Sequence, residues 1–286
     1  MIVAINYSDD NYKFQQEYNT KTAYKVGGVD KVIEYSPQDI DVDFYKKNAA
    51  IFAYKRGAGL WLWKPYIIYK TLQTMEDNDY LFYCDAGVYY VNKVNRLIDV
   101  MEKKKVPLMT FELPLLEREW TKKETFDVMD YHQYDNNQIC ATYILMKNCE
   151  ASKKIIAEWL FYMQDERCAS PKQCTEEPNF DDFVEHREDQ SVFSVVCHKY
   201  NIVPFRDPSQ YGDRPYQYAW MKSYNGRWKE WTYNEKKYQN SLYPRIVVSN
   251  RSTVPSKYKR REMFRNLLCR LGLYKCYFKY KSGAKF

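Results

Sequence analysis

An aspartate and a glycine follow one of the most apolar stretches of the chain. Residues 80–84 are apolar or aromatic and run without a break into Asp85, Ala86 and Gly87. A carboxylate at the end of a buried strand can hold a divalent cation or bind a ribose hydroxyl, and a glycine two residues later lets a diphosphate approach the backbone. Asp-x-Gly is also ordinary turn chemistry without any function, so the choice between the two depends on the neighbouring motifs.

A second group of residues combines basic, glycine and tryptophan side chains. The stretch RGAGLWLWKP spans residues 56–65 and stands just before a predicted helix that opens at Pro65. Helix N-termini attract anions through their unpaired N–H groups, and Lys64 adds a full positive charge there. Such a cation is unfavourable for the helix itself, which favours a phosphate-binding role for Lys64 and Arg56. The alternative is that the tryptophans are core residues and Lys64 is solvated.

The third group is the sequence HREDQS at residues 186–191. An acid near a helix start, Glu188 or Asp189, is either a helix cap or a general base that takes the proton of an acceptor hydroxyl. His186 orients a phosphate or binds a metal, or it is structural, as a lone histidine more often is.

The elements that must position these motifs alternate between strands and helices, which is typical of βαβ units and of a mostly parallel, doubly wound sheet. Ligands of such sheets bind outside the carboxyl ends of the strands, so we expect Tyr7 and Ser8 to lie beside Asp85. The predicted strands cover residues 1–7, 31–36, 79–85, 106–113 and 141–146. The predicted helices cover residues 13–24, 65–75, 95–105, 150–166 and 184–202, and a further helix starts near residue 43. Residues 206–256 are predicted to form an irregular region on the acceptor side.

Charge is distributed unevenly along the 286 residues. The formal net charge is +7, yet residues 255–286 alone hold ten lysines and arginines against the single acid Glu262, which leaves 34 basic and 36 acidic residues in the rest. The nearly neutral body shows no basic face or aromatic-basic motif, so we expect no nucleic-acid partner. The eight cysteines show no CxxC pair or zinc-ligand spacing, and neither a secretory signal nor a membrane-spanning stretch is evident. These features predict a cytoplasmic location.

The basic C-terminal segment has its own apolar pattern. Met263, Leu267, Leu268 and Leu271 recur at helical spacing among arginines, which is typical of a helix that lies on an anionic membrane surface. A solvated tail or a helix packed on the body is the alternative. We therefore divide the chain into a catalytic domain, residues 1–254, and an amphipathic tail, residues 255–286.

Together, the stretches RGAGLWLWKPYIIYKTL, DYLFYCDAG and HREDQSVFS resemble the GT-A-type glycosyltransferases that bacteria encode with capsule, O-antigen and other surface polysaccharides. The stretches INYSDDNY and FRDPSQYGD also fit, so the resemblance extends over roughly residues 3–213. It implies a GT-A-like, Rossmann-type α/β fold and a nucleotide-sugar donor bound at the carboxyl ends of the first strands.

The resemblance also implies roles for particular residues. Asp85 matches the first aspartate of the family's Asp-x-Asp motif and is the implied ligand of a divalent cation, Mn²⁺ or Mg²⁺, whereas Gly87 stands where many relatives have the second aspartate. A glycine supplies no side-chain ligand to a metal ion at that position. Asp189 matches the acidic stretch that supplies the acceptor-side base of inverting enzymes, so Asp85 and Asp189 are the predicted catalytic residues. The predicted donor-binding residues are Tyr7, Ser8, Arg56, Trp61, Lys64, Asp85, Gly87 and His186.

The predicted function is that of a nucleotide-sugar-dependent glycosyltransferase of the hexosyltransferase type. It would transfer a sugar, from a UDP-sugar by preference, to a hydroxyl of a growing, lipid-linked surface glycan, either in the cytoplasm or peripherally on the inner face of the cell membrane. The alternative is a non-catalytic module that binds a nucleotide sugar or a glycan, which the missing second aspartate favours and the intact HREDQS stretch disfavours.

Overall fold

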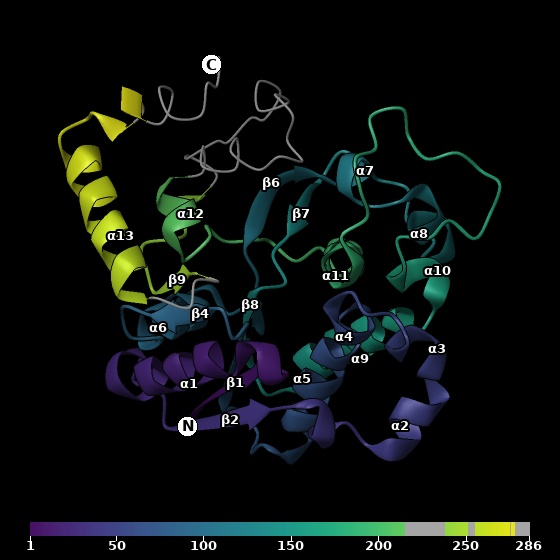
Figure 1. Cartoon of the computed structure of the whole chain (residues 1–286), viewed down its shortest axis with the longest axis horizontal. Coiled ribbons are helices and arrows are strands. Elements are labelled where there is room, and N and C mark those ends of the chain that lie inside the picture. Colours follow the sequence, from purple (N-terminus) through teal and green to yellow (C-terminus); the bar gives the residue numbers. More distant parts are fainter. Residues whose placement is uncertain (215–237, 251–254, 275, 278–286) are drawn as a thin grey trace.

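The computed structural model describes residues 1–214, 238–250, 255–274 and 276–277 (Figure 1). Its strands are β1 (Ile2–Tyr7), β2 (Lys31–Tyr35), β3 (Tyr80–Cys84), β4 (Val88–Tyr90), β5 (Leu108–Met109), β6 (Glu112–Leu116), β7 (Asn137–Ile139), β8 (Tyr143–Lys147) and β9 (Val247–Ser249). Its α-helices are α1 (Lys13–Thr22), α2 (Val42–Lys47), α3 (Ala49–Phe52), α4 (Gly57–Leu60), α5 (Trp63–Thr74), α6 (Asn95–Lys104), α7 (Glu117–Trp120), α8 (Lys123–Val128), α9 (Glu150–Met163), α10 (Glu166–Ala169), α11 (Glu188–Lys199), α12 (Gln210–Asp213) and α13 (Pro255–Arg270).

A five-stranded sheet with the order β2-β1-β3-β8-β5 forms the centre of the fold. β1 pairs in parallel with both β2 and β3, and β8 is antiparallel to both of its neighbours. Four of the five strands therefore point the same way. The predicted α/β class, with a mostly parallel sheet flanked by helices, is confirmed.

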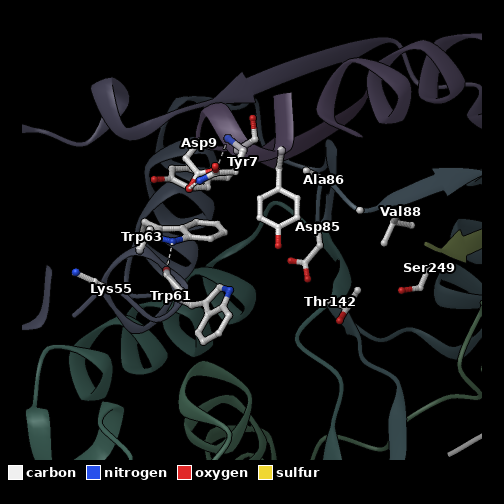
Figure 2. A pocket seen from close by; sticks show the side chains of 16 residues that line it. Tyr7, Asp9, Lys55, Trp61, Trp63, Asp85, Ala86, Val88, Thr142 and Ser249 are labelled. Atoms are coloured by element: carbon white, nitrogen blue, oxygen red, sulfur yellow. Dashed lines mark hydrogen bonds between the residues drawn. The ribbon is translucent and has the colours of Figure 1, made fainter. Parts of the chain in front are cut away.

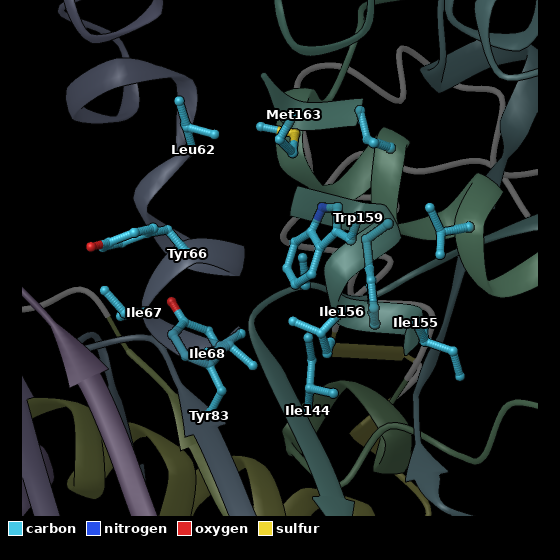
Figure 3. Packing of buried hydrophobic residues seen from close by; sticks show 14 of the residues in the cluster. Leu62, Tyr66, Ile67, Ile68, Tyr83, Ile144, Ile155, Ile156, Trp159 and Met163 are labelled. Atoms are coloured by element: carbon cyan, nitrogen blue, oxygen red, sulfur yellow. The ribbon is translucent and has the colours of Figure 1, made fainter. Parts of the chain in front are cut away.

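The two faces of the sheet bury alternate residues of each strand, as the pleat requires. On β1, Val3 and Ile5 belong to one apolar cluster, whereas Ile2 and Ala4 belong to the other. The first cluster contains the buried faces of α5, α9 and α11, and Figure 3 shows side chains of α5 and α9 meeting over β3 and β8. The second cluster includes buried residues of α6. Both faces are thus covered by helices, and function has to be sought at the strand ends.

One predicted strand is divided in the structure. The single strand predicted over residues 106–113 is divided: β5 stays in the central sheet, while β6 pairs with β7 in a separate ladder. The division occurs because Phe111 pairs with Phe205 instead of with the sheet. The chain then returns as β8, antiparallel between β3 and β5.

The helix predicted to open at Pro65 begins two residues earlier, at Trp63. The first four N–H groups of a helix have no intrahelical partner, so proline is tolerated at its third position. Lys64 consequently lies inside the first turn of α5.

The helical pattern predicted in the C-terminal segment corresponds to α13, which lies beside α12 at one edge of the molecule (Figure 1). Glu262 on α13 is buried and forms ion pairs with Arg214, Arg245 and Arg265. Among the described residues, no helix has the length and apolar character of a membrane span.

Candidate active site

A cavity of about 360 Å³ opens at the carboxyl ends of β1 and β3. Figure 2 shows Tyr7, Trp61, Trp63 and Lys55 on one side of it and Asp85, Thr142, Val88 and Ser249 on the other. The described lining residues are Tyr7, Ser8, Asp9, Asn11, Tyr12, Lys55, Gly57, Ala58, Trp61, Trp63, Asp85, Ala86, Gly87, Val88, Thr142 and Ser249. The expected meeting of Tyr7, Ser8 and Asp85 at one strand edge is therefore observed.

Hydrogen bonds from several elements hold the turn that follows β3. The N–H of Val88 donates to the carbonyl of Asp85 at 3.0 Å, which closes the turn, and the N–H of Asp85 donates to the carbonyl of Thr142 at 2.8 Å. The buried amide of Asn19 on α1 donates to the carbonyl of Val88 at 2.8 Å. The turn is thus fixed on three sides, and the Asp85 side chain projects from a rigid support.

The two oxygens of the Asp85 carboxylate have different surroundings. Oδ1 accepts a hydrogen bond of 2.5 Å from the hydroxyl of Tyr83 and lies 3.4 Å from Nζ of Lys64. No hydrogen bond to Oδ2 is found within the described residues, and 28% of the side chain is exposed. Asp85 therefore has one oxygen held by the protein and one available to a ligand in the cavity.

Lys64 lies beneath Asp85 with only 3% of its side chain exposed. Its ammonium lies 2.5 Å from Oδ2 of Asp189 and donates to the carbonyl oxygen of Ala141 at 3.1 Å. Burial opposes the charged ammonium, but Asp189 and Asp85 favour it, and the pKa of Lys64 is raised. The ammonium is thus a buried positive charge that contacts oxygen atoms of Asp189, Ala141 and Asp85.

Asp189 lies in the first turn of α11, next to Lys64. The N-cap residue of α11 is Arg187, whose side chain makes no capping hydrogen bond, and the Asp189 carboxylate pairs with Lys64. Burial raises the pKa of Asp189 to about 6, against the opposing effect of the Lys64 charge. A carboxylate with such a pKa is ionised at neutral pH and is close to the range suited to general base catalysis.

The glycines of the RGAG motif permit a left-handed turn at the mouth of the cavity. Five successive residues, 57–61, have positive φ angles. A Cβ at Gly57 would lie 2.3 Å from the Trp61 ring, and one at Gly59 would lie 2.6 Å from the Phe52 ring. Left-handed backbone costs a non-glycine residue roughly 1–2 kcal/mol, and such strain is found mainly at functional sites.

Aromatic rings form the wall opposite Asp85. The rings of Tyr7 and Trp63 are stacked, with centroids 3.8 Å apart and planes inclined by 15°. The indole N–H of Trp63 donates to the carbonyl of Gly57 at 2.9 Å, which ties the wall to the left-handed turn. The predicted alternative, that the tryptophans are core residues, holds in part, because Trp63 is buried and yet lines the cavity.

Five of the predicted donor-binding residues line the cavity, namely Tyr7, Ser8, Trp61, Asp85 and Gly87. Arg56, Lys64 and His186 lie outside its described lining. Nε of Arg56 forms an ion pair of 2.5 Å with Glu188, whose carboxylate is buried. Burial raises the pKa of Glu188 to about 7, so the ion pair with Arg56 stabilises a charge that burial opposes.

The donor-binding or metal-binding role predicted for His186 does not fit the structure. The ring is buried, Nδ1 accepts from the N–H of Lys122 at 3.3 Å, and Nε2 lies 2.8 Å from the carbonyl of Cys168. Burial lowers the pKa of His186 to about 3, so the ring is neutral. Because backbone groups use both nitrogens, His186 is a structural residue of this loop.

Several lining residues were not identified from the sequence. Lys55 is the one lysine or arginine in the described lining, and its signal was its position directly before the RGAG motif. Asp9, Asn11 and Tyr12 follow β1 as Ser8 does, and they belonged to the stretch INYSDDNY. Thr142 and Ser249 carried no local signal.

The residues at the end of β3 do not fit the divalent cation that the resemblance implies. Gly87 offers no side-chain ligand, and both Asp85 and Asp189 already have the Lys64 ammonium as their counter-ion. Among the described residues, no group of three or more His, Cys, Asp or Glu side chains could hold a metal ion. The metal-ligand role predicted for Asp85 is therefore not supported.

No family model matches the chain, and no curated protein matches it significantly. Solved structures align over most of its length. The galactosyltransferase LgtC, in complex with donor and acceptor sugar analogs, is 15% identical over 88% of this chain and 87% of its own, with a TM-score of 0.47. The apo form of mouse xyloside xylosyltransferase 1 is 7% identical over 89% of this chain and 99% of its own, with a TM-score of 0.49.

A third solved structure is the glycosyltransferase GlyE of Streptococcus pneumoniae TIGR4. It is 13% identical over 87% of this chain and 54% of its own, with a TM-score of 0.40.

Proposed function

We propose that this protein is a glycosyltransferase that transfers a sugar from a nucleoside diphosphate sugar, a UDP-sugar by preference, to a hydroxyl group of a glycan. One observation carries the proposal: the carboxyl ends of β1 and β3 deliver Tyr7, Ser8 and Asp85 to a single cavity, beside the buried Lys64–Asp189 ion pair. An aromatic wall facing a carboxylate suits a ligand with flat and hydroxyl-rich parts.

Within this proposal, the donor occupies the cavity between the aromatic wall and the turn after β3. The exposed ammonium of Lys55 faces the diphosphate, and Oδ2 of Asp85 accepts a hydrogen bond from a ribose or sugar hydroxyl. Gly87 lets the diphosphate approach the backbone of the turn. Trp61 and the Tyr7–Trp63 stack support the flat base. Catalysis then relies largely on positioning and on fixed charges.

In the transfer step, one bond breaks, another forms and one proton is transferred. The bond from the anomeric carbon to the diphosphate oxygen breaks, and its electron pair stays on the diphosphate. The oxygen of the acceptor hydroxyl forms the new bond to that carbon, and its proton goes to Asp189. Asp189 is suited to this base role by its raised pKa of about 6.

We assign the acceptor to a lipid-linked surface glycan, such as a capsule or lipopolysaccharide precursor, and the tail to an anionic membrane surface. What supports this assignment is the composition of α13 and the residues after it. Met263, Leu267 and Leu271 are 71%, 53% and 60% exposed, and the basic side chains of Arg260 and Arg270 are exposed nearby. Apolar side chains exposed among arginines suit an interfacial helix. The division at residue 254 belongs to this proposal.

The function is tested by measuring binding and transfer with a panel of UDP-, GDP-, dTDP- and CMP-sugars. We expect one nucleotide class to bind at least tenfold more tightly than the others, that is by about 1.4 kcal/mol, and its sugar to be transferred to a glycan acceptor. Failure of every sugar nucleotide to bind would refute the proposal.

Binding without turnover, over a range of acceptors, would instead favour the second candidate, a non-catalytic nucleotide-sugar or glycan-binding module. The absence of a second aspartate at Gly87 is the observation that favours it.

A further inference from the structure

The ammonium of Lys64 is held by oxygen atoms from three separate segments of the chain. It contacts Oδ2 of Asp189 at 2.5 Å, the carbonyl oxygen of Ala141 at 3.1 Å and Oδ1 of Asp85 at 3.4 Å. The ring centroid of Tyr83 lies 5.4 Å away, within the range of a cation–π interaction. The position is therefore already occupied by a fixed positive charge.

Burial holds that charge in place. The Lys64 side chain is only 3% exposed, so its ammonium stays next to Asp189, whose side chain is 8% exposed. Lys64 belongs to the first turn of α5 and Asp189 to the first turn of α11, and α11 packs with the helices on the same face of the sheet. The ion pair is thus part of the core that supports the cavity.

A divalent cation has little to bind at this position. Oxygen ligands lie about 2.0–2.6 Å from Mg²⁺ or Ca²⁺, so a cation on Oδ2, the available oxygen of Asp85, would share this carboxylate with the Lys64 ammonium, which lies 3.4 Å from Oδ1. Salt screens charges only weakly in such a partly buried site. Gly87 supplies no second carboxylate. One carboxylate that already has a counter-ion is a poor metal site.

From this arrangement we infer that Lys64 is the resident cation of the site, in the place of a divalent metal, and that the protein binds its nucleoside diphosphate without one. The inference rests on the proposed function, because a nucleoside diphosphate is the ligand. The three charged groups sum to one negative charge, since Asp85 and Asp189 outnumber Lys64. Lys55 in the cavity lining then supplies the positive charge that faces the diphosphate.

The first test titrates Mn²⁺ into the wild-type protein and follows free Mn²⁺ by electron paramagnetic resonance, with no nucleotide present. We expect no protein-bound Mn²⁺. A second measurement compares UDP binding by calorimetry in EDTA and in excess Mn²⁺, with an expected difference of less than about twofold. A 1:1 Mn²⁺ complex that is lost in Asp85→Asn, or UDP binding weakened tenfold or more by EDTA, would overturn the inference.

Substitution of the lysine provides the converse test. In Lys64→Met a neutral side chain of similar length leaves two carboxylates without a counter-ion, so we expect Mn²⁺ binding to appear. Lys70→Met is the matched control, because Lys70 lies on the same helix and pairs with Asp41 at the surface; it should bind no Mn²⁺. A folded Lys64→Met protein that remains unable to bind Mn²⁺ would contradict the inference.

If Lys64→Met fails to fold, the wild-type measurements alone still show whether the protein binds Mn²⁺ and whether UDP binding requires it. They also separate the two proposals. The Mn²⁺ titration requires no nucleotide, so a protein that binds neither Mn²⁺ nor any nucleoside diphosphate would refute the proposed function and agree with the absence of a metal site. A protein that binds UDP only with Mn²⁺ would support the proposed function and refute this inference.

Discussion

Nζ of Lys64 lies 2.5 Å from Oδ2 of Asp189, and both side chains are buried. The contact joins the start of α5 to the start of α11 and places the pair directly behind Asp85. Removing one partner of a buried ion pair leaves the other charge uncompensated, at a cost of roughly 3–5 kcal/mol. The pair is therefore both a support of the fold and a source of fixed charge at the cavity, and variants must be chosen so that these two roles can be separated.

Asp85→Ala should reduce sugar transfer by at least about 100-fold, or 2.7 kcal/mol, because the cavity loses the carboxylate that faces the donor. The melting temperature should change little, since the side chain is 28% exposed. Asp79→Ala is the control: Asp79 lies at the opposite end of β3 and pairs with the N-terminal amine. A rate of sugar transfer by Asp85→Ala within about threefold of the wild-type rate would show that Asp85 does not take part in the reaction.

Asp189→Asn should strongly reduce turnover while the affinity for the nucleoside diphosphate stays within about twofold. Asparagine keeps the size of the side chain and removes the base that accepts the acceptor proton. Single-turnover rates and calorimetry on the same preparation separate the two effects. If donor affinity falls together with turnover, Asp189 acts through Lys64 on the donor site or on the fold, and the base role is wrong.

The free energy of unfolding should depend on pH through Glu188, whose pKa burial raises to about 7. The folded state then holds a proton that the unfolded state has lost, so this group stabilises the fold below its unfolded pKa, and the contribution is lost as the pH rises to about 7. Relative to Glu188→Gln, wild type should lose on the order of 1–3 kcal/mol between pH 4.5 and pH 7.

Urea denaturation of both proteins across this range checks the Glu188 prediction. His186 acts in the opposite direction, because burial lowers its pKa to about 3. Since His186 is present in both proteins, its effect cancels in the difference. A difference in unfolding free energy that does not vary with pH would contradict the predicted proton uptake by Glu188.

Lys55→Ala should weaken the binding of UDP by about tenfold, or 1.4 kcal/mol, and leave the binding of uridine unchanged. The reason is that Lys55 is the one lysine of the described cavity lining, and in the proposed function its charge interacts with the diphosphate. Lys47→Ala on α2 serves as the control, because that side chain is exposed and outside the described lining. Calorimetry showing equal losses for nucleotide and nucleoside would count against this role.

The triple substitution of Met263, Leu267 and Leu271 by serine should reduce binding to anionic vesicles by at least about tenfold, and wild-type binding should weaken as salt screens the charges. The three side chains are largely exposed, so the fold should be retained. Leu242→Ser is a matched control, since Leu242 is 84% exposed elsewhere on the body. Equal co-sedimentation of all variants with the vesicles, or no co-sedimentation of the wild-type protein at low salt, would show that the C-terminal segment does not bind membranes.

Local patterns in the sequence were sufficient for much of the fold. Apolar runs identified strands such as β1 and β3, Pro65 marked the start of α5, and the helical spacing of apolar residues identified α9 and α11, because these patterns reflect short-range hydrogen bonding and burial. The rule that ligands bind at strand ends then placed Tyr7, Ser8 and Asp85 together, as observed. In each case the information lies within a few residues along the chain.

Only the tertiary structure decided which side chains meet. Lys64 was predicted to face a phosphate, yet its ammonium contacts Asp189. His186 was predicted to bind a ligand, yet backbone groups from two other segments contact both of its ring nitrogens. The antiparallel insertion of β8, which brings Thr142 to the cavity, had no local signal either. Such partners are set by the packing of helices and strands that are distant in sequence, and burial then determines which charges are paired and which remain available to a ligand.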